Sequence, residues 1–149
     1  MKKIYISGDH AGFKLKEKLK KYLEKKGFRI KDFGPHEYNK NDDYPDYVVP
    51  MARAVAKNKV RGIITAGSGE GEGIAVNKLK GVRATVYHGK NLRIIKTSRE
   101  HNNANVLSLG SRFVTENEAK KAIEIFLKTK FSGGRHKRRL KKIEKLGGK

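Results

Sequence analysis

GIITAGSGEGEGIAVNK, residues 62–78, joins a short apolar run to a helical pattern through a loop rich in glycine. Residues 62–66 are mostly apolar, as in a buried strand, and residues 72–79 place apolar side chains at helical spacing. Between them, residues 67–73 contain four glycines and two glutamates. A strand that passes through glycines into a helix is typical of a parallel sheet, whose ligands bind beyond the carboxyl ends of its strands. This stretch therefore predicts a fold class and the place of a site.

The rest of the chain repeats the same alternation of strand and helix. Further strands are expected at 3–7, 28–33, 82–87 and 105–110, and further helices at 14–26, 47–58, 91–101, 115–129 and in the basic segment after 134. Asp46 is expected to cap the second of these helices, and Thr115 with Glu118 to form a capping box at the start of the helix 115–129. We predict a single domain over residues 1–149, a parallel sheet covered on both faces, and a basic segment of about 132–149 that packs on a partner subunit.

Composition excludes several classes of site. The chain has no cysteine, so disulfides, thiolate metal sites and thiol nucleophiles are absent. No apolar run approaches the length of a membrane span and no secretory signal is recognisable, which predicts a cytoplasmic protein with no membrane partner. The formal charge of +21 fits either solvated lysine-rich helix faces or a surface that binds nucleic acid, and the first interpretation is favoured because the apolar side chains of 14–26 leave its lysines on the outward face.

The glycine loop matches neither of the common nucleotide-binding patterns. The dinucleotide fingerprint fails because Glu72 stands at its third glycine, and the P-loop fails because no Gly-Lys-Ser/Thr follows. Free backbone amides at the end of a strand could still bind an oxyanion. A glutamate at a helix start, desolvated beside such amides, suits a general base that removes a proton next to a carbonyl. An aldose–ketose isomerase uses this chemistry; a capping glutamate beside a ligand-free glycine crossover remains the structural alternative.

Five motifs occur in an order that resembles the type B ribose-5-phosphate isomerase family, which includes galactose-6-phosphate isomerase subunits. They are GDHAGFKLK (8–16), DYPDY (43–47), GSGEGEGIAVNK (67–78), REHNNANVLSLGSR (99–112) and GGRHKRRL (133–140). The resemblance extends from residue 3 to about 140. It implies a Rossmann-like three-layer αβα sandwich with a five-stranded parallel sheet and a C-terminal helical arm. It also implies a homodimer or a dimer of dimers, with the active site between subunits and with neither metal nor cofactor.

The resemblance also implies roles for individual residues. Family members use either a cysteine, at the position of Ala66, or a glutamate, at the position of Glu72, as the base for interconverting ribose 5-phosphate and ribulose 5-phosphate. This chain has the glutamate, and its His101 matches the histidine that opens the sugar ring. The remaining matches are Asn102 and Ser68 with the amides of Gly67, Gly69 and Gly71 for the enediolate oxygen; Asp9, His10 and Tyr44 for the sugar; and Arg112, Arg135, His136 and Arg139 for the phosphate.

Two alternatives remain open from the sequence. The substrate could be another phosphosugar, such as galactose 6-phosphate, allose 6-phosphate or a four-carbon erythrulose phosphate. From a different class, the chain could be a polyanion-binding or nucleic-acid-binding protein on the same fold. Glu70 has no match in the family pattern, and His36 and His88 are interpreted as loop residues.

Overall fold

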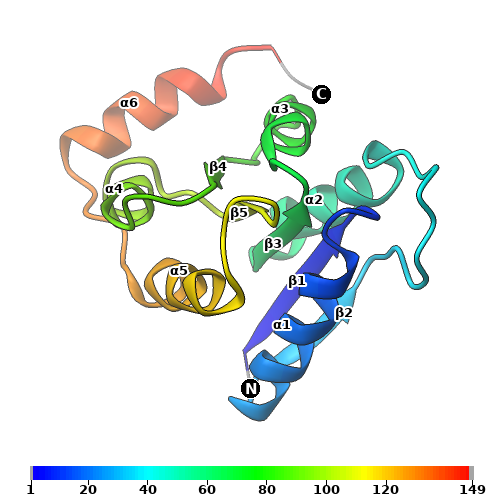
Figure 1. The fold of residues 1–149 in the computed structure, drawn as a ribbon. Helices are drawn as coiled ribbons and strands as arrows, with labels where there is room; N and C mark the ends of the chain where they lie inside the picture. The colour runs from blue at the N-terminus through cyan, green and yellow to red at the C-terminus, as the bar shows by residue number, and fades with distance from the viewer. Residues whose placement is uncertain (1, 148–149) are drawn as a thin grey trace.

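The computed structural model describes residues 2–147 and contains one parallel sheet of five strands (Figure 1). The strands lie in the order β2-β1-β3-β5-β4. Their bounds are β1 (Lys3–Gly8), β2 (Arg29–Asp32), β3 (Arg61–Ala66), β4 (Ala84–Tyr87) and β5 (Val106–Gly110). The central strands β1, β3 and β5 are almost entirely buried because helices cover both of their faces. The predicted five-stranded parallel sheet is confirmed.

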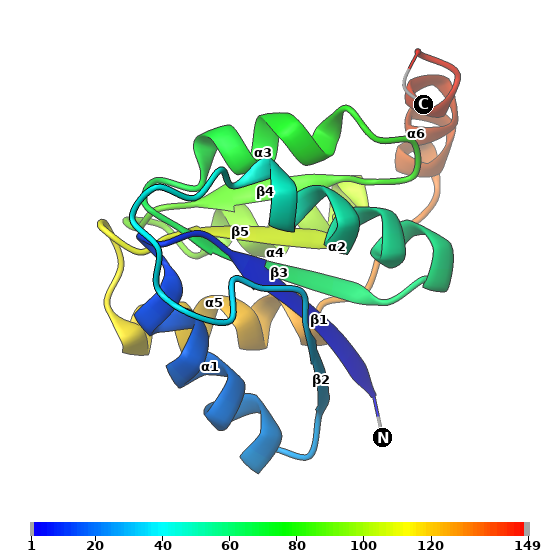
Figure 2. The same ribbon diagram turned by 90° about the vertical axis from the view of Figure 1, so that its right-hand side faces the viewer.

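Six helices lie on the two faces of this sheet and at its margin. They are α1 (Phe13–Lys25), α2 (Pro45–Asn58), α3 (Glu70–Asn77), α4 (Arg93–Asn102), α5 (Glu116–Lys128) and α6 (Arg135–Glu144). One core packs α1, α4 and α5 against one face, and a second packs α2 and α3 against the other. Figure 2 shows α2 and α3 above the sheet with α1 and α5 below it. The three-layer αβα arrangement predicted from the sequence is therefore confirmed.

Local signals in the sequence placed some helix ends correctly and others not. The capping box is present at α5, where the Thr115 hydroxyl accepts from the Glu118 amide and the Glu118 side chain accepts from the Thr115 amide. The prediction that Asp46 caps α2 is wrong, because the helix begins at Pro45 and Asp46 lies inside its first turn. Helix α3 begins at Glu70, two residues earlier than predicted, so both loop glutamates lie in its first turn.

All five strands are parallel, so their carboxyl ends lie along one side of the sheet and their amino ends along the opposite side. We call these two sides the carboxyl edge and the amino edge; the names refer to the ends of the strands and not to the outer strands β2 and β4. In Figure 2 the amino edge is on the right, beside the N label and α6, and the loops of the carboxyl edge are on the left. Helix α6 contacts α4 of the same chain, where the rings of His101 and His136 stack, and its Leu140 is buried. The expected packing of this basic segment on a partner subunit stays a prediction, and its last two residues lie outside the described ones. No helix within 2–147 is long and apolar enough to cross a membrane.

Candidate active site

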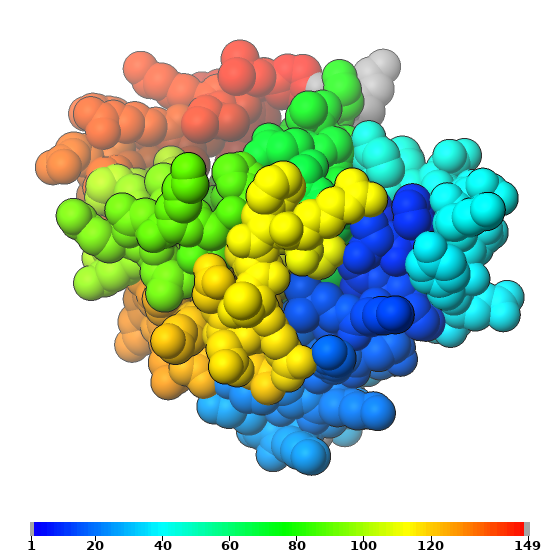
Figure 3. Space-filling model, viewed as in Figure 1, coloured from blue at the N-terminus to red at the C-terminus, as the bar shows by residue number. Residues whose placement is uncertain are grey.

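Three loops meet at the carboxyl edge, after β1, β3 and β5. The Asp9 amide donates to the carbonyl of Thr65 at 3.2 Å, and the Ser111 amide donates to the carbonyl of Ala66 at 2.7 Å. The Ser111 hydroxyl donates to the carbonyl of Ala11 at 2.9 Å. Figure 3 shows the result, with the yellow segment after β5 beside the dark blue segment after β1. These bonds hold the glycine loop between two neighbouring loops.

The glycine loop leaves backbone amides free. Within residues 2–147, the amides of Gly67, Ser68 and Gly69 have no hydrogen-bond acceptor, while the Ser68 hydroxyl accepts from the Glu70 amide at 3.1 Å. Gly69 has a φ of 82°, in the left-handed region that favours glycine, and turns the chain into α3. Three unpaired donors at the start of a helix can stabilise a negative oxygen.

Two of the loop glycines permit close approach by other side chains. A Cβ at Gly71 would lie 2.5 Å from the hydroxyl of Tyr44, and a Cβ at Gly67 would lie 2.9 Å from a guanidinium nitrogen of Arg112. Glycine is therefore needed at both positions for these side chains to approach the loop. The structure thus brings Tyr44 and Arg112 to the same edge as the loop.

Two buried carboxyl groups lie beside the loop. Glu72 is 4% exposed and Asp9 is 7% exposed. The Gly12 amide donates to Asp9 at 3.0 Å, which fixes this carboxylate at the end of β1. Burial and the neighbouring Asp9 carboxyl, with a smaller contribution from the charge of Asp42, raise the pKa of Glu72 to about 7. A carboxyl group that titrates near neutrality can both take and return a proton.

A third carboxyl group in this cluster was missed from the sequence. The side chain of Asp42 is 1% exposed, and its Oδ1 lies 2.8 Å from Nδ1 of His10. Its second oxygen is buried and has no hydrogen-bond partner within the described residues. Asp42 therefore orients the His10 ring while adding negative charge near Glu72. The local sequence does not show which of the neighbouring residues Asp42 and Asp43 is buried. Only the folded path of the loop shows that the Asp42 side chain is buried and that Asp43 is exposed.

The structure also gives Glu70 a partner. Its carboxylate lies 3.0 Å from Nε2 of His88, which follows β4, and both side chains are about half exposed. His88 was interpreted as a loop residue and Glu70 was left without a role. Their contact joins the start of α3 to the loop after β4.

The other predicted site residues lie at the amino edge. His101 and Asn102 are exposed residues at the end of α4. They lie at the amino edge because α4 runs back from the end of β4 to the start of β5. The rings of His101 and His136 stack with centroids 4.2 Å apart and planes 12° apart. Arg135 and Arg139, both exposed, lie one turn apart on α6. Desolvation and the charges of His101 and these two arginines lower the pKa of His136.

One chain therefore holds two separate groups of predicted site residues. The carboxyl edge has Asp9, His10, Tyr44, Gly67, Ser68, Gly69, Gly71, Glu72 and Arg112, and the amino edge has His101, Asn102, Arg135, His136 and Arg139. Parallel strands impose this division, since a helix that follows one strand must return to the opposite edge before the next strand begins. Across 2–147 there is no group of three or more acidic or histidine side chains that could hold a metal ion.

A buried glutamate whose pKa lies near neutrality, with a second buried carboxyl group and free amides beside it at the carboxyl edge of an α/β sheet, is the site of an enzyme that works by acid–base chemistry. Comparison with known proteins agrees with this class. Residues 4–143 match the model of the Ribose/Galactose Isomerase family. The chain belongs to this family.

Individual relatives cover nearly the whole chain. Ribose-5-phosphate isomerase B of Mycobacterium tuberculosis is 36% identical over 140 residues, covering 93% of this chain and 85% of the relative. The structure of ribose-5-phosphate isomerase B from Clostridium thermocellum has a TM-score of 0.90 at 43% identity, covering 95% of each chain. The structure of the Mycoplasma genitalium enzyme with bound ribulose-5-phosphate has the same TM-score and identity, covering 95% of this chain and 93% of its own. The family resemblance predicted from the five motifs is confirmed.

Proposed function

We propose that this protein interconverts ribose 5-phosphate and ribulose 5-phosphate through an enediolate, with Glu72 as the base. The observation that carries this proposal is the buried Glu72–Asp9 pair beside three free amides. Glu72 takes the proton from C2 of the open-chain aldose, and the carbonyl oxygen on C1 becomes an oxyanion. Glu72 then returns the proton to C1, while the hydroxyl proton on the C2 oxygen passes to the C1 oxygen, which leaves the ketose with its carbonyl at C2. The amides of residues 67–69 donate to that oxygen. This step needs neither a metal nor a cofactor.

The sugar and its phosphate are assigned to the groups around the base. Asp9 and His10 bind the sugar hydroxyls, and Asp42 fixes the orientation of the His10 ring by its 2.8 Å contact. Tyr44 lies against the glycine loop and bounds the sugar site. Arg112, which approaches Gly67, is the phosphate ligand supplied from the same edge.

A second copy of the chain would supply the remaining groups. His101 would protonate the ring oxygen of the cyclic sugar, Asn102 would help to hold the enediolate oxygen, and Arg135, His136 and Arg139 would bind the phosphate. This assignment is supported by the division between the two edges, because these residues cannot reach Glu72 of their own chain. Exposed apolar side chains on α3, on α4, after β5, on α6 and just after α6 also favour a homodimer, or a dimer of dimers; they are Ile74, Ile94, Phe113, Ile143 and Leu146.

The proposed function is tested by an isomerase assay with five-, six- and four-carbon phosphosugars on the wild type, Glu72→Gln and Glu70→Gln. Glu70 is the matched control because it lies in the same helical turn but is exposed. We expect the five-carbon pair to react best and Glu72→Gln to lower kcat by roughly 10³-fold, the scale of a lost general base. Near wild-type turnover by Glu72→Gln would contradict the assignment, and preference for a six- or four-carbon sugar would favour that substrate.

A polyanion-binding function is the second candidate, favoured only by the charge of +21. Binding to a nucleic-acid backbone weakens steeply with salt and accepts any duplex. Polyanion binding as the function would be excluded if isomerase activity persists in moderate salt and the protein does not change the electrophoretic mobility of duplex DNA. The proposed compartment is the cytoplasm, where charged phosphosugars are retained.

A further inference from the structure

Three arginine side chains surround a cavity of about 510 Å³ at the amino edge of the sheet. Arg61 begins β3, Arg83 precedes β4 and Arg99 lies in the last turn of α4. Arg99 is 3% exposed and the other two are partly buried. Burial and the positive charges of Arg61 and Arg83 lower the pKa of Arg99 to about 10, so the three guanidinium groups repel one another. We call this group the arginine cavity.

The hydrogen bonds of these arginines leave part of each guanidinium group free. Their acceptors are all neutral oxygens: the carbonyls of Phe126, Gly81, Asn103, Thr129 and Ala104, and the side-chain oxygen of Asn103. Among residues 2–147, no hydrogen bond engages Nη2 of any of the three. Each arginine is therefore held through its Nε or Nη1 atom, while the two N–H groups of its Nη2 atom remain available as donors.

The positive charge of the cavity is not balanced by the chain. No carboxylate within the described residues lies at ion-pair distance from any of the three arginines. Glu144 is the single acidic residue among the described residues of the lining; its charge acts on Arg83 from beyond ion-pair distance. Lys59 adds a fourth cation, so one carboxylate faces four positive charges. Buried charges are ordinarily paired, because desolvation without a counter-ion costs free energy. An anion is the missing partner.

We propose that the arginine cavity binds a small polyanion that carries phosphate groups. Planar guanidinium groups present paired N–H donors that match phosphate oxygens, and several cations around one cavity suit a ligand with two or more negative charges. The site lies at the opposite edge from Glu72 and includes none of the residues assigned to the phosphosugar. It is thus a second anion site in each chain, and its occupation is measured as binding, so it does not depend on the proposed isomerase activity.

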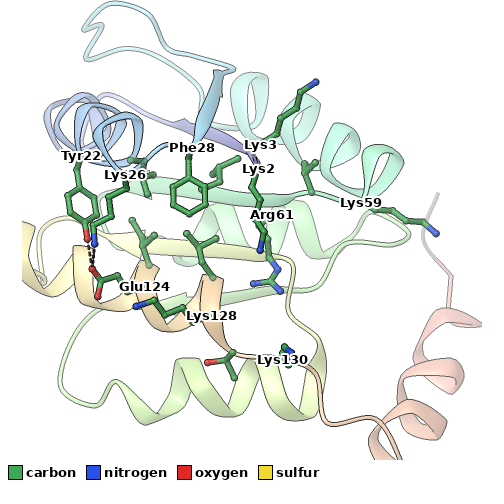
Figure 4. Close-up of a pocket in the computed structure, with 16 residues that line it drawn as sticks. Lys2, Lys3, Tyr22, Lys26, Phe28, Lys59, Arg61, Glu124, Lys128 and Lys130 are labelled. Carbon is green, nitrogen blue, oxygen red and sulfur yellow. Dashed lines mark hydrogen bonds and ion pairs between the residues drawn. The ribbon is translucent and has the colours of Figure 1, made fainter.

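A neighbouring groove strengthens the attraction for anions. This groove has a volume of about 560 Å³ and shares Lys59, Val60 and Arg61 with the arginine cavity. Figure 4 shows Arg61 within it and lysine side chains from several elements around it; they are Lys2, Lys3, Lys26, Lys59, Lys128 and Lys130. Glu124, the one carboxylate among the described residues that line the groove, already accepts from the Tyr22 hydroxyl at 2.5 Å and from Lys26 at 2.8 Å. The positive field of the groove extends that of the cavity and raises the local concentration of anions.

The test is calorimetric titration of the full chain with inorganic pyrophosphate. It is done in an Arg112→Gln background, so that pyrophosphate bound at the carboxyl edge is weakened. Arg61→Gln removes one guanidinium group from the cavity, and Lys128→Gln is the matched control, because Lys128 lies on the groove rim but outside the cavity lining. We expect Arg61→Gln to weaken pyrophosphate binding by about tenfold or more, the scale of a lost charge-assisted pair, and Lys128→Gln to change it less than about twofold.

A second variant protects the test against loss of folding. Lys59 is exposed and lines the cavity, so Lys59→Gln should fold and should weaken pyrophosphate binding by about threefold, as expected for loss of one solvated charge. Equal binding by Arg61→Gln and its parent would overturn the proposal. So would equal losses in Lys59→Gln and Lys128→Gln, because the anion would then respond only to surface charge.

Discussion

The two edges of the sheet bury opposite charges. The carboxyl edge collects the carboxyl groups of Asp9, Asp42 and Glu72, although basic residues outnumber acidic ones by more than two to one in the chain. The amino edge collects Arg61, Arg83 and Arg99 without a paired carboxylate among the described residues. Each edge therefore gathers like charges that repel, and the layered core keeps the two groups apart.

The difference between the edges lies in how the repulsion is relieved. A carboxyl group can take a proton near neutrality, and burial with its acidic neighbours raises the pKa of Glu72 into that range. Guanidinium groups keep their charge even where burial lowers the pKa to about 10, so the arginine cavity can be neutralised only by an anion. The same physical situation supports the proposed proton-transfer site at one edge and the proposed anion site at the other.

The largest effect is expected from mixing two inactive chains. Glu72→Gln damages the carboxyl edge and His101→Ala damages the amino edge, so a dimer of one chain of each kind keeps one undamaged site if the proposed pairing of edges is correct. Random mixing should restore about a quarter of the wild-type sites, a gain of roughly 10²-fold over either variant alone. The measurement is kcat on ribose 5-phosphate after co-refolding. A mixture no more active than its components would show that each site is built from one chain.

The second effect is on stability, and its sign depends on pH. The pKa of Glu72 is raised from 4.5 to about 7, so ionising this group costs the folded state stability as pH rises between these values. Glu72→Gln should therefore match the wild type near pH 4 and exceed it at pH 8 by about 3 kcal/mol in the free energy of unfolding, since each pKa unit corresponds to about 1.4 kcal/mol. Denaturant unfolding at both pH values checks this. The exposed Glu70→Gln should show no such pH-dependent gain, and an equal gain there would argue against the buried charge as its cause.

The third effect is a displaced pH profile. Asp9→Asn removes the carboxylate nearest to Glu72, so the pKa of Glu72 should fall towards its ordinary value and the acidic limb of kcat/KM should move to lower pH by about one unit. The measurement is the apparent pKa of the acidic limb of the kcat/KM profile, and not the height of the profile, because loss of a sugar ligand also lowers kcat/KM at every pH. An unmoved limb would mean that Asp9 does not act on the base.

The smallest effect is expected from Asp42. Its charge acts on Glu72 less than that of Asp9, so Asp42→Asn should move the same limb in the same direction by about 0.3 to 0.5 units. The asparagine oxygen can still accept from His10, which limits the loss of orientation. Asp43→Asn, one residue away and exposed, is the matched control. A limb that moves equally in both variants would attribute the shift to general surface charge.

Hydrophobic periodicity in the sequence predicted the order of strands and helices, because the buried runs of β1, β3 and β5 differ clearly from the amphipathic helices. Helix starts were less predictable. Asp46 is an ordinary capping residue by type, yet Pro45 before it already fits the first turn and moves the helix start forward. The local sequence cannot decide whether α2 begins at Pro45 or is capped by Asp46, because the packing around the helix start determines which of the two occurs.

The site was predictable where motifs stand at strand ends, and not where contacts cross the fold. Glu72 follows directly from the glycine loop, whereas the burial of Asp42 and the pairing of Glu70 with His88 depend on paths of distant loops. The placement of His101 opposite Glu72 follows from strand–helix alternation alone, since α4 has to end where β5 begins.

The position of His101 has a kinetic consequence. If the two halves of a catalytic set lie at opposite edges of one chain, intramolecular assembly is impossible and the rate obeys mass action between chains. Specific activity would then stay constant at high protein concentration and decline in proportion to concentration below the dissociation constant of the dimer. The dissociation constant of the dimer could then be obtained from the specific activity measured across protein concentrations.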